Sequence, residues 1–260
     1  MAMRDAVAMW RNTRLVVLTA VSASLYAALL IPFKVLPLIP GVTELRPANA
    51  VPVVCSFLFG PAGAWGAAIG NLIGDFFGGI GPGDLFGFAG NFLYGFLPYT
   101  AWRALSGADP LPRTAPQWVA FVGVVALAAG ACGLIIGWGL NGLGFVPFAV
   151  LANIIFFNNF VMAVVLSPLL LLAIYPRVKQ AGLRYDDLVA TSHGSVARRR
   201  LGLTAVVIGV VGGLVVGNLL STGRIEIAAL VSQPPGTRAA QVGVGVAPFV
   251  ALVGLGVILL

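Results

Sequence analysis

Charged side chains are scarce in this chain: of its 260 residues only 9% are Asp, Glu, Lys or Arg, whereas 59% are hydrophobic. A soluble domain carries about 25% charged residues, so the composition excludes an ordinary water-soluble fold. The P-loop and the HExxH, GxSxG and CxxC patterns are all missing, which argues against ATP hydrolysis by that route and against the common hydrolase and redox sites. We therefore expect a protein that binds or conducts, without catalytic activity and without a cofactor.

Histidine and cysteine, the usual metal and redox ligands, are nearly absent. The single histidine, His193, lies in a polar stretch where we expect a solvated loop. Cys55 and Cys132 lie in separate apolar runs without metal-ligand spacing, so we expect two small buried hydrophobic side chains and no metal site. A thiolate that binds a metal-containing substrate is the alternative interpretation.

What the chain does contain is a series of apolar runs of the length that a bilayer requires, about 20 residues of helix for a core of about 30 Å. We expect spans near residues 15–33, 47–60, 62–78, 84–104, 117–140, 146–175, 201–220 and 241–260. The sequence thus predicts an all-α integral membrane protein. Its expected parts are a six-helix membrane bundle over 1–180, a basic cytoplasmic linker over 181–200, and two additional C-terminal transmembrane helices over 201–260.

The basic residues orient the predicted spans. With a cytoplasmic N-terminus, eleven of the 15 Lys and Arg residues fall in cytoplasmic segments, and the other four are Lys34, Arg46, Arg224 and Arg238. This asymmetry satisfies the positive-inside rule and attracts the anionic lipids of the inner leaflet. We assign the arginines at 198–200 to this role and expect no nucleic-acid partner. Nucleic-acid binding is the alternative for that cluster, and a signal peptide is the alternative for the first apolar run.

One apolar run combines a glycine period with a carboxylate. Its glycines recur every fourth residue, at Gly66, Gly70, Gly74 and Gly78. In lipid, such a row of small residues lets two helix backbones approach closely. Asn71 and Asp75 lie one turn apart on the face beside the glycines. Because a carboxylate in hydrocarbon is costly, we expect Asp75 to face a protein interior or a wet cavity.

Further polar side chains stand at membrane depth in two other predicted helices. Asp84 is the first residue of one of them, where it serves either as a helix cap or as a ligand-binding carboxylate.

The proline-rich outer loop at 33–49 is expected to be either a lid over a cavity mouth or a plain interfacial turn. We expect a shared outward cavity that binds a small molecule. The candidate substrate-binding residues are Arg46, Asn49, Asp75, Asp84, Asn91, Tyr94, Asn153 and Asn158.

The glycine run also carries a family resemblance. Residues 59–75 read FGPAGAWGAAIGNLIGD, which resembles the hallmark stretch of the substrate-binding S components of energy-coupling-factor (ECF) vitamin transporters. In the first predicted helix, Ala23 and Ala27 form an Ala-x-x-x-Ala pattern like the one that these proteins use to contact their coupling subunit. The resemblance covers about residues 10–180. The two C-terminal spans lie beyond it.

The resemblance implies a multi-pass protein of a prokaryotic cell membrane with its substrate held near the outer side, beneath the first loop. It implies that the chain captures a small vitamin-like or nucleobase-like nutrient. Release inside then depends on a membrane coupling subunit and two cytoplasmic ATPases. The signatures of the thiamine, biotin and riboflavin binders are not evident, so the resemblance leaves the substrate open.

Two other classes of function are compatible with the same residues. The first is a self-sufficient secondary transporter or channel that uses Asp75 for ion coupling. The second is a membrane enzyme or assembly factor, which the missing catalytic patterns disfavour.

Overall fold

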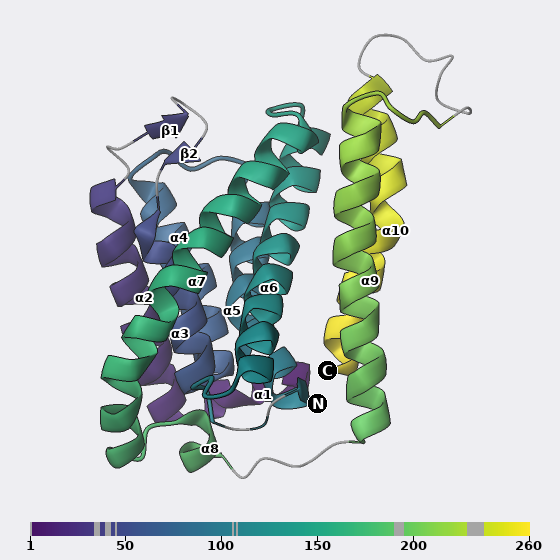
Figure 1. The fold of residues 1–260 in the computed structure, drawn as a ribbon. Coiled ribbons are helices and arrows are strands. Elements are labelled where there is room, and N and C mark those ends of the chain that lie inside the picture. Colours follow the sequence, from purple (N-terminus) through teal and green to yellow (C-terminus); the bar gives the residue numbers. More distant parts are fainter. Residues whose placement is uncertain are drawn as a thin grey trace.

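The computed structural model describes residues 2–33, 37–39, 43–44, 46–105, 107, 109–189, 195–227 and 237–260. Nearly all of this part of the chain is helical (Figure 1). Two short strands, β1 (Pro37–Ile39) and β2 (Thr43–Glu44), pair antiparallel at one end of the helices, here called the β end. His193 lies outside the described residues, as do Lys34 and other parts of the proline-rich loop.

The helices lie where the apolar runs predict them. Their bounds are α1 (Ala2–Ala8), η1 (Met9–Arg11), α2 (Thr13–Phe33), η2 (Pro47–Asn49), α3 (Ala50–Phe59), α4 (Pro61–Phe76), α5 (Asp84–Leu105), α6 (Ala115–Gly142), α7 (Phe148–Gln180), α8 (Tyr185–Leu188), α9 (Val196–Ser221) and α10 (Thr237–Leu259). Within the described residues, five helices are long and apolar enough to cross a membrane: Thr13–Phe33, Ala115–Gly142, Phe148–Leu188, Val196–Ser221 and Arg238–Leu259. The chain is therefore a multi-pass, all-helical membrane protein.

The predicted span at 47–60 corresponds to the single turn η2 followed by the ten-residue helix α3. The ten residues of α3 rise only about 15 Å, half of a bilayer core, so α3 does not cross a membrane alone. At its end, Gly60 adopts a positive φ of 55° and Pro61 begins α4. A side chain at Gly63 would place its Cβ 2.4 Å from the Cys55 carbonyl oxygen. Glycine at this position therefore lets α4 fold back directly against α3.

The glycine period of α4 packs against α2. A Cβ at Gly66 would lie 2.3 Å from Cβ of Ser22, and one at Gly70 would lie 2.7 Å from the Ala23 carbonyl oxygen. The side chains of Ala23 and Ala27 are both buried inside the chain. Their expected contact with a coupling subunit stays a prediction, and in this conformation the pair is covered by the protein itself.

The C-terminal helices α9 and α10 pair with each other and lie beside α6 (Figure 1). Backbone meets backbone between them, since a Cβ at Gly202 would lie 2.8 Å from the Gly256 carbonyl oxygen. The Trp138 indole N–H donates a hydrogen bond of 3.0 Å from α6 to the Gly243 carbonyl of α10. The two C-terminal helices are therefore packed against α6.

An ion pair joins α5 to α8 at the end opposite to the β end (Figure 1). Arg103 pairs with Asp186, and its guanidinium lies over the rings of Tyr99 and Tyr185 at 5.7 and 6.0 Å. Asp5 of α1 interacts with the same cluster through Tyr185, and partial burial raises the pKa of the Asp5 carboxyl. These contacts hold the first helix under the bundle.

The close contact of α2 with α4 generates a stability prediction. Gly70→Ala places a methyl group against the Ala23 carbonyl and the Tyr26 side chain, so we expect a loss of about 1–3 kcal/mol in the free energy of unfolding. The control is Gly123→Ala in α6, where a Cβ meets nothing within 4 Å. Thermal or denaturant unfolding of the full chain in detergent measures both. Equal stability of the two variants would contradict close packing at Gly70.

Candidate functional site

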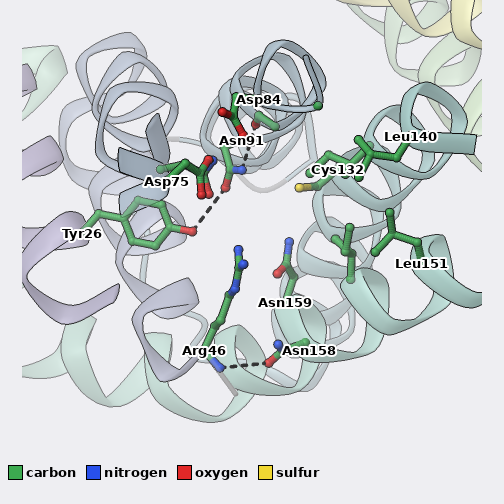
Figure 2. Close-up of a pocket in the computed structure, with 15 residues that line it drawn as sticks. Tyr26, Arg46, Asp75, Asp84, Asn91, Cys132, Leu140, Leu151, Asn158 and Asn159 are labelled. Carbon is green, nitrogen blue, oxygen red and sulfur yellow. Dashed lines mark hydrogen bonds between the residues drawn. The ribbon is translucent and has the colours of Figure 1, made fainter. Parts of the chain in front are cut away.

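A cavity of about 210 Å³ lies among helices α2, α4, α5, α6 and α7 (Figure 2). Its apolar side is formed by α6 and α7, through Ile136, Leu140, Leu151 and Ile155. Its remaining walls are polar and are drawn from all five helices and from the residue before η2. Those polar side chains are Tyr26, Arg46, Asn71, Asp75, Asp84, Asn91, Cys132, Asn158 and Asn159.

A network of buried hydroxyl and amide groups supports one side of the cavity. The Tyr26 hydroxyl lies 2.9 Å from Oδ1 of Asn49 and 3.2 Å from Oδ1 of Asn91, so its one proton serves two acceptors. The Asn49 amide donates to Oδ1 of Asn159 at 2.5 Å. The Tyr94 hydroxyl lies 2.9 Å from the Asn49 carbonyl and 3.1 Å from the Asn159 carbonyl. These bonds join α2, η2, α5 and α7 around the first residues of α3.

The α4 side of the cavity presents the predicted amide and carboxylate pair. Nδ2 of Asn71 donates a hydrogen bond of 2.6 Å to Oδ2 of Asp75, one turn further along the same helix. Both side chains line the cavity, next to Gly87 of α5. The spacing of four residues therefore places them on one face, as predicted.

Asp84 lines the cavity at the first residue of α5. One of its oxygens, Oδ2, accepts a hydrogen bond of 2.8 Å from the backbone N–H of Gly81. This contact fixes the turn that leads into the helix. The same carboxylate still borders the cavity, so the local structural role and the expected ligand-binding role are compatible.

Arg46 approaches from the opposite side. Its backbone N–H lies 3.4 Å from Oδ1 of Asn158, and its guanidinium extends toward the middle of the cavity (Figure 2). Among the described lining residues, one cationic side chain thus meets the two carboxylates of Asp75 and Asp84. The arrangement offers hydrogen-bond acceptors and donors on facing walls, and it favours neutral or cationic ligands over anionic ones.

The predicted site residues fall into three groups. Five of them line the cavity together: Arg46, Asp75, Asp84, Asn91 and Asn158. Asn49 and Tyr94 are buried behind its wall, where they hydrogen-bond to residues that line it. Asn153 lies elsewhere.

The position of Asn153 corrects the sequence-based expectation. Its Nδ2 donates to Oδ1 of Asn218 on α9 at 2.7 Å, and Nδ2 of Asn218 lies 3.3 Å from Oδ1 of Asn153. Asn153 and Asn158 are five residues apart, which is about 140° around a helix, so they face different neighbours. Asn153 therefore joins α7 to α9, and it is not among the residues that line the cavity.

Four polar lining residues were not among the predicted site residues: Tyr26, Asn71, Cys132 and Asn159. The spacing between Asn71 and Asp75 could have indicated Asn71 as a lining residue. The position of Asn159 next to Asn158 could have indicated Asn159. Tyr26 lies within the Ala23–Ala27 pattern, which is typical of close helix packing. Cys132 is buried in α6 among apolar residues, and no motif marks it.

The amide pair between α7 and α9 generates a second stability prediction. Asn153→Leu or Asn218→Leu alone removes the inter-helical bonds of the other asparagine, whose Nδ2 still donates to a carbonyl of its own helix, so we expect a loss of about 1 kcal/mol. The double variant removes both amides, so its loss should be smaller than the sum of the single losses. Unfolding of the four proteins in detergent completes the cycle. Additive losses would contradict a direct interaction.

Comparison with known proteins identifies the family of this chain. A family model described as QueT transporter matches residues 16–176, more than half of the chain and a range that contains every residue lining the cavity. No curated protein and no solved structure matches the chain. QueT transporters are an ECF-type S component family associated with a queuosine precursor, so the resemblance in the glycine run is confirmed. The chain, a multi-pass membrane protein with a transport role, belongs to the QueT transporter family.

Proposed function

We propose that this chain is the membrane-embedded substrate-capture subunit of an ECF-type importer for a queuosine precursor or a closely related nucleobase-like nutrient. The observation that carries the proposal is the polar cavity among α2, α4, α5, α6 and α7, which lies wholly within the segment that matches the family. The family name supplies the substrate class, and the cavity supplies a place of suitable size and chemistry.

The cavity size favours a single base. Its volume of about 210 Å³ is below the roughly 300–1,000 Å³ of pockets that bind drug-sized molecules. Queuosine contains a 7-deazaguanine base, a flat bicyclic group with several N–H donors and one carbonyl acceptor. A base of this size suits such a volume.

The lining chemistry favours the same class. Asp75 and Asp84 are hydrogen-bond acceptors for ring N–H and amino groups, and their charge favours a cationic substituent. Arg46 donates to a carbonyl or ring nitrogen from the facing wall. Asn91 and Asn158 each offer an amide for polar edges, while the apolar side chains of α6 and α7 cover a flat face.

The proposed membrane placement follows from the basic residues. With the N-terminus in the cytoplasm, the β end and Arg46 lie toward the outside, so the cavity receives substrate from the outer side. In this arrangement six helices, including the short α3, form the S-component bundle, and α9 and α10 add two further spans. The membrane is the cell membrane of a prokaryote.

The proposed transport step requires partners. The chain has no P-loop, so ATP-driven release needs a coupling subunit and two cytoplasmic ATPases. Ala23 and Ala27 remain the proposed contact with the coupling subunit, and since both are now buried, contact would require α2 and α4 to separate at this point. The alternative function is a self-sufficient secondary transporter or channel in which Asp75 binds the coupling ion.

Reconstituted uptake distinguishes these functions. We expect liposomes that contain the full chain, a coupling subunit and both ATPases to accumulate labelled 7-deazaguanine only when ATP is present. Liposomes with the chain alone should bind the base without accumulating it. Accumulation by the chain alone under an ion gradient would contradict the proposal and support the alternative.

Two asparagines of α7 provide a matched test of the cavity. Asn158→Ala removes an amide that lines the cavity, so we expect the Kd for 7-deazaguanine to rise roughly 10-fold. Asn153→Ala removes the same group from the α9 contact and should leave the Kd within about 2-fold. Calorimetric titration of the full chain in lipid nanodiscs measures both. A larger rise in Kd for Asn153→Ala than for Asn158→Ala would indicate that the base binds at the α7–α9 contact instead.

A further inference from the structure

One buried polar atom in the cavity has no partner among the described residues. Asn71 is only 3% exposed, and its amide nitrogen bonds Asp75, yet its carbonyl oxygen Oδ1 accepts no hydrogen bond. Of the buried side-chain nitrogen and oxygen atoms in the described part of the chain, Oδ1 of Asn71 and Nε of Arg199 are the two without a partner. Buried acceptors are rarely left in this state, so a partner from outside the chain is expected.

Asp75 determines the orientation of the Asn71 amide, and therefore which of its two polar atoms lacks a hydrogen-bond partner. A carboxylate only accepts hydrogen bonds, so Nδ2 of Asn71 has to be the atom that lies 2.6 Å from Oδ2 of Asp75. Turning the amide over would bring two acceptor oxygens together in a buried place. The side chain is therefore held with its nitrogen toward Asp75, and its buried carbonyl oxygen is left without a partner in a residue that lines the cavity.

Gly87 leaves space beside this pair. A Cβ at Gly87 would lie 3.3 Å from Nδ2 of Asn71, which is a tight contact, and 3.7 Å from Oδ2 of Asp75, which is ordinary van der Waals contact. The missing side chain thus keeps the approach from α5 open. Gly87 also accepts a hydrogen bond of 2.9 Å from the Asn91 amide through its carbonyl, which fixes this stretch of α5.

We propose that Asn71 determines specificity by accepting a hydrogen bond from an N–H group of the substrate through Oδ1. Asp75 is the positioning residue that holds the Asn71 amide in the required orientation. The site therefore selects bases that present an N–H donor at this edge and rejects analogues in which that donor is removed or blocked. This inference rests on the proposed function, because it takes a nucleobase-like substrate as given.

A cycle between protein variants and ligand analogues tests the proposal. The probes are 7-deazaguanine and three analogues that each lack one kind of donor: 7-deazahypoxanthine, 1-methyl-7-deazaguanine and 9-methyl-7-deazaguanine. The Kd of each is measured by calorimetric titration with the wild-type full chain in nanodiscs and with Asn71→Leu, which keeps the size of the side chain. We expect one analogue to bind wild type at least about 10-fold more weakly than 7-deazaguanine, because it leaves Oδ1 buried without a partner.

The decisive quantity is the ratio of the Kd of the analogue to the Kd of 7-deazaguanine, compared between wild type and Asn71→Leu. In Asn71→Leu the penalty for the same analogue should fall to about 2-fold, since the acceptor that reads the donor is gone. If all three penalties are the same in wild type and in Asn71→Leu, the proposal is overturned. If 7-deazaguanine does not bind wild type at all, the proposed substrate class fails instead, so the two failures are distinguishable.

Two substitutions of Asp75 separate positioning from mere stability and remain informative if Asn71→Leu does not fold. In Asp75→Asn the new amide still offers an oxygen to Nδ2 of Asn71, so the preference among the analogues should persist whatever happens to overall affinity. In Asp75→Ala the Asn71 amide is free to turn, and the preference should fall below about 3-fold. Equal preference in the two variants would refute the positioning role.

Discussion

Polar groups that are buried at membrane depth have to find their partners inside the protein, because hydrocarbon offers none. Five side chains from α2, η2, α5 and α7 meet this requirement by bonding one another: Tyr26, Asn49, Asn91, Tyr94 and Asn159. The network holds the first residues of α3 in the interior and sets one wall of the cavity. Because these hydrogen bonds join groups of the protein itself, they fix the side chains along this wall of the proposed site.

Close backbone contact is the second requirement of this architecture. The glycines of α4 let it lie against α2, and Gly60 and Gly63 let it reverse from the short α3. Larger side chains at Gly66, Gly70 or Gly74 would separate α2 from α4, the helices that carry Tyr26 and Asp75. The packing of small residues and the shape of the cavity are therefore parts of one arrangement.

Much of the fold was predictable from hydropathy, since apolar runs of sufficient length have few alternatives to helices in a bilayer. The extent of α3 was not predictable in this way, because the start of the helix depends on the hydrogen bonds that Asn49 makes with other helices. The site was predictable in part. The cost of a polar group at membrane depth singled out Asp75, Asp84 and Asn158, which the structure brings to one cavity, and their role in binding stays a prediction. Asn153 was misplaced by the same reasoning, because the direction that it faces depends on where α9 packs.

The position of the bound substrate tests this arrangement. An experimental structure of the full chain with 7-deazaguanine bound would show that position. We expect the base within the cavity between Arg46 and the Asn71–Asp75 pair, with an N–H group within hydrogen-bond distance of Oδ1 of Asn71. A base bound elsewhere, or bound in the cavity with Asn71 still lacking a partner, would contradict this arrangement.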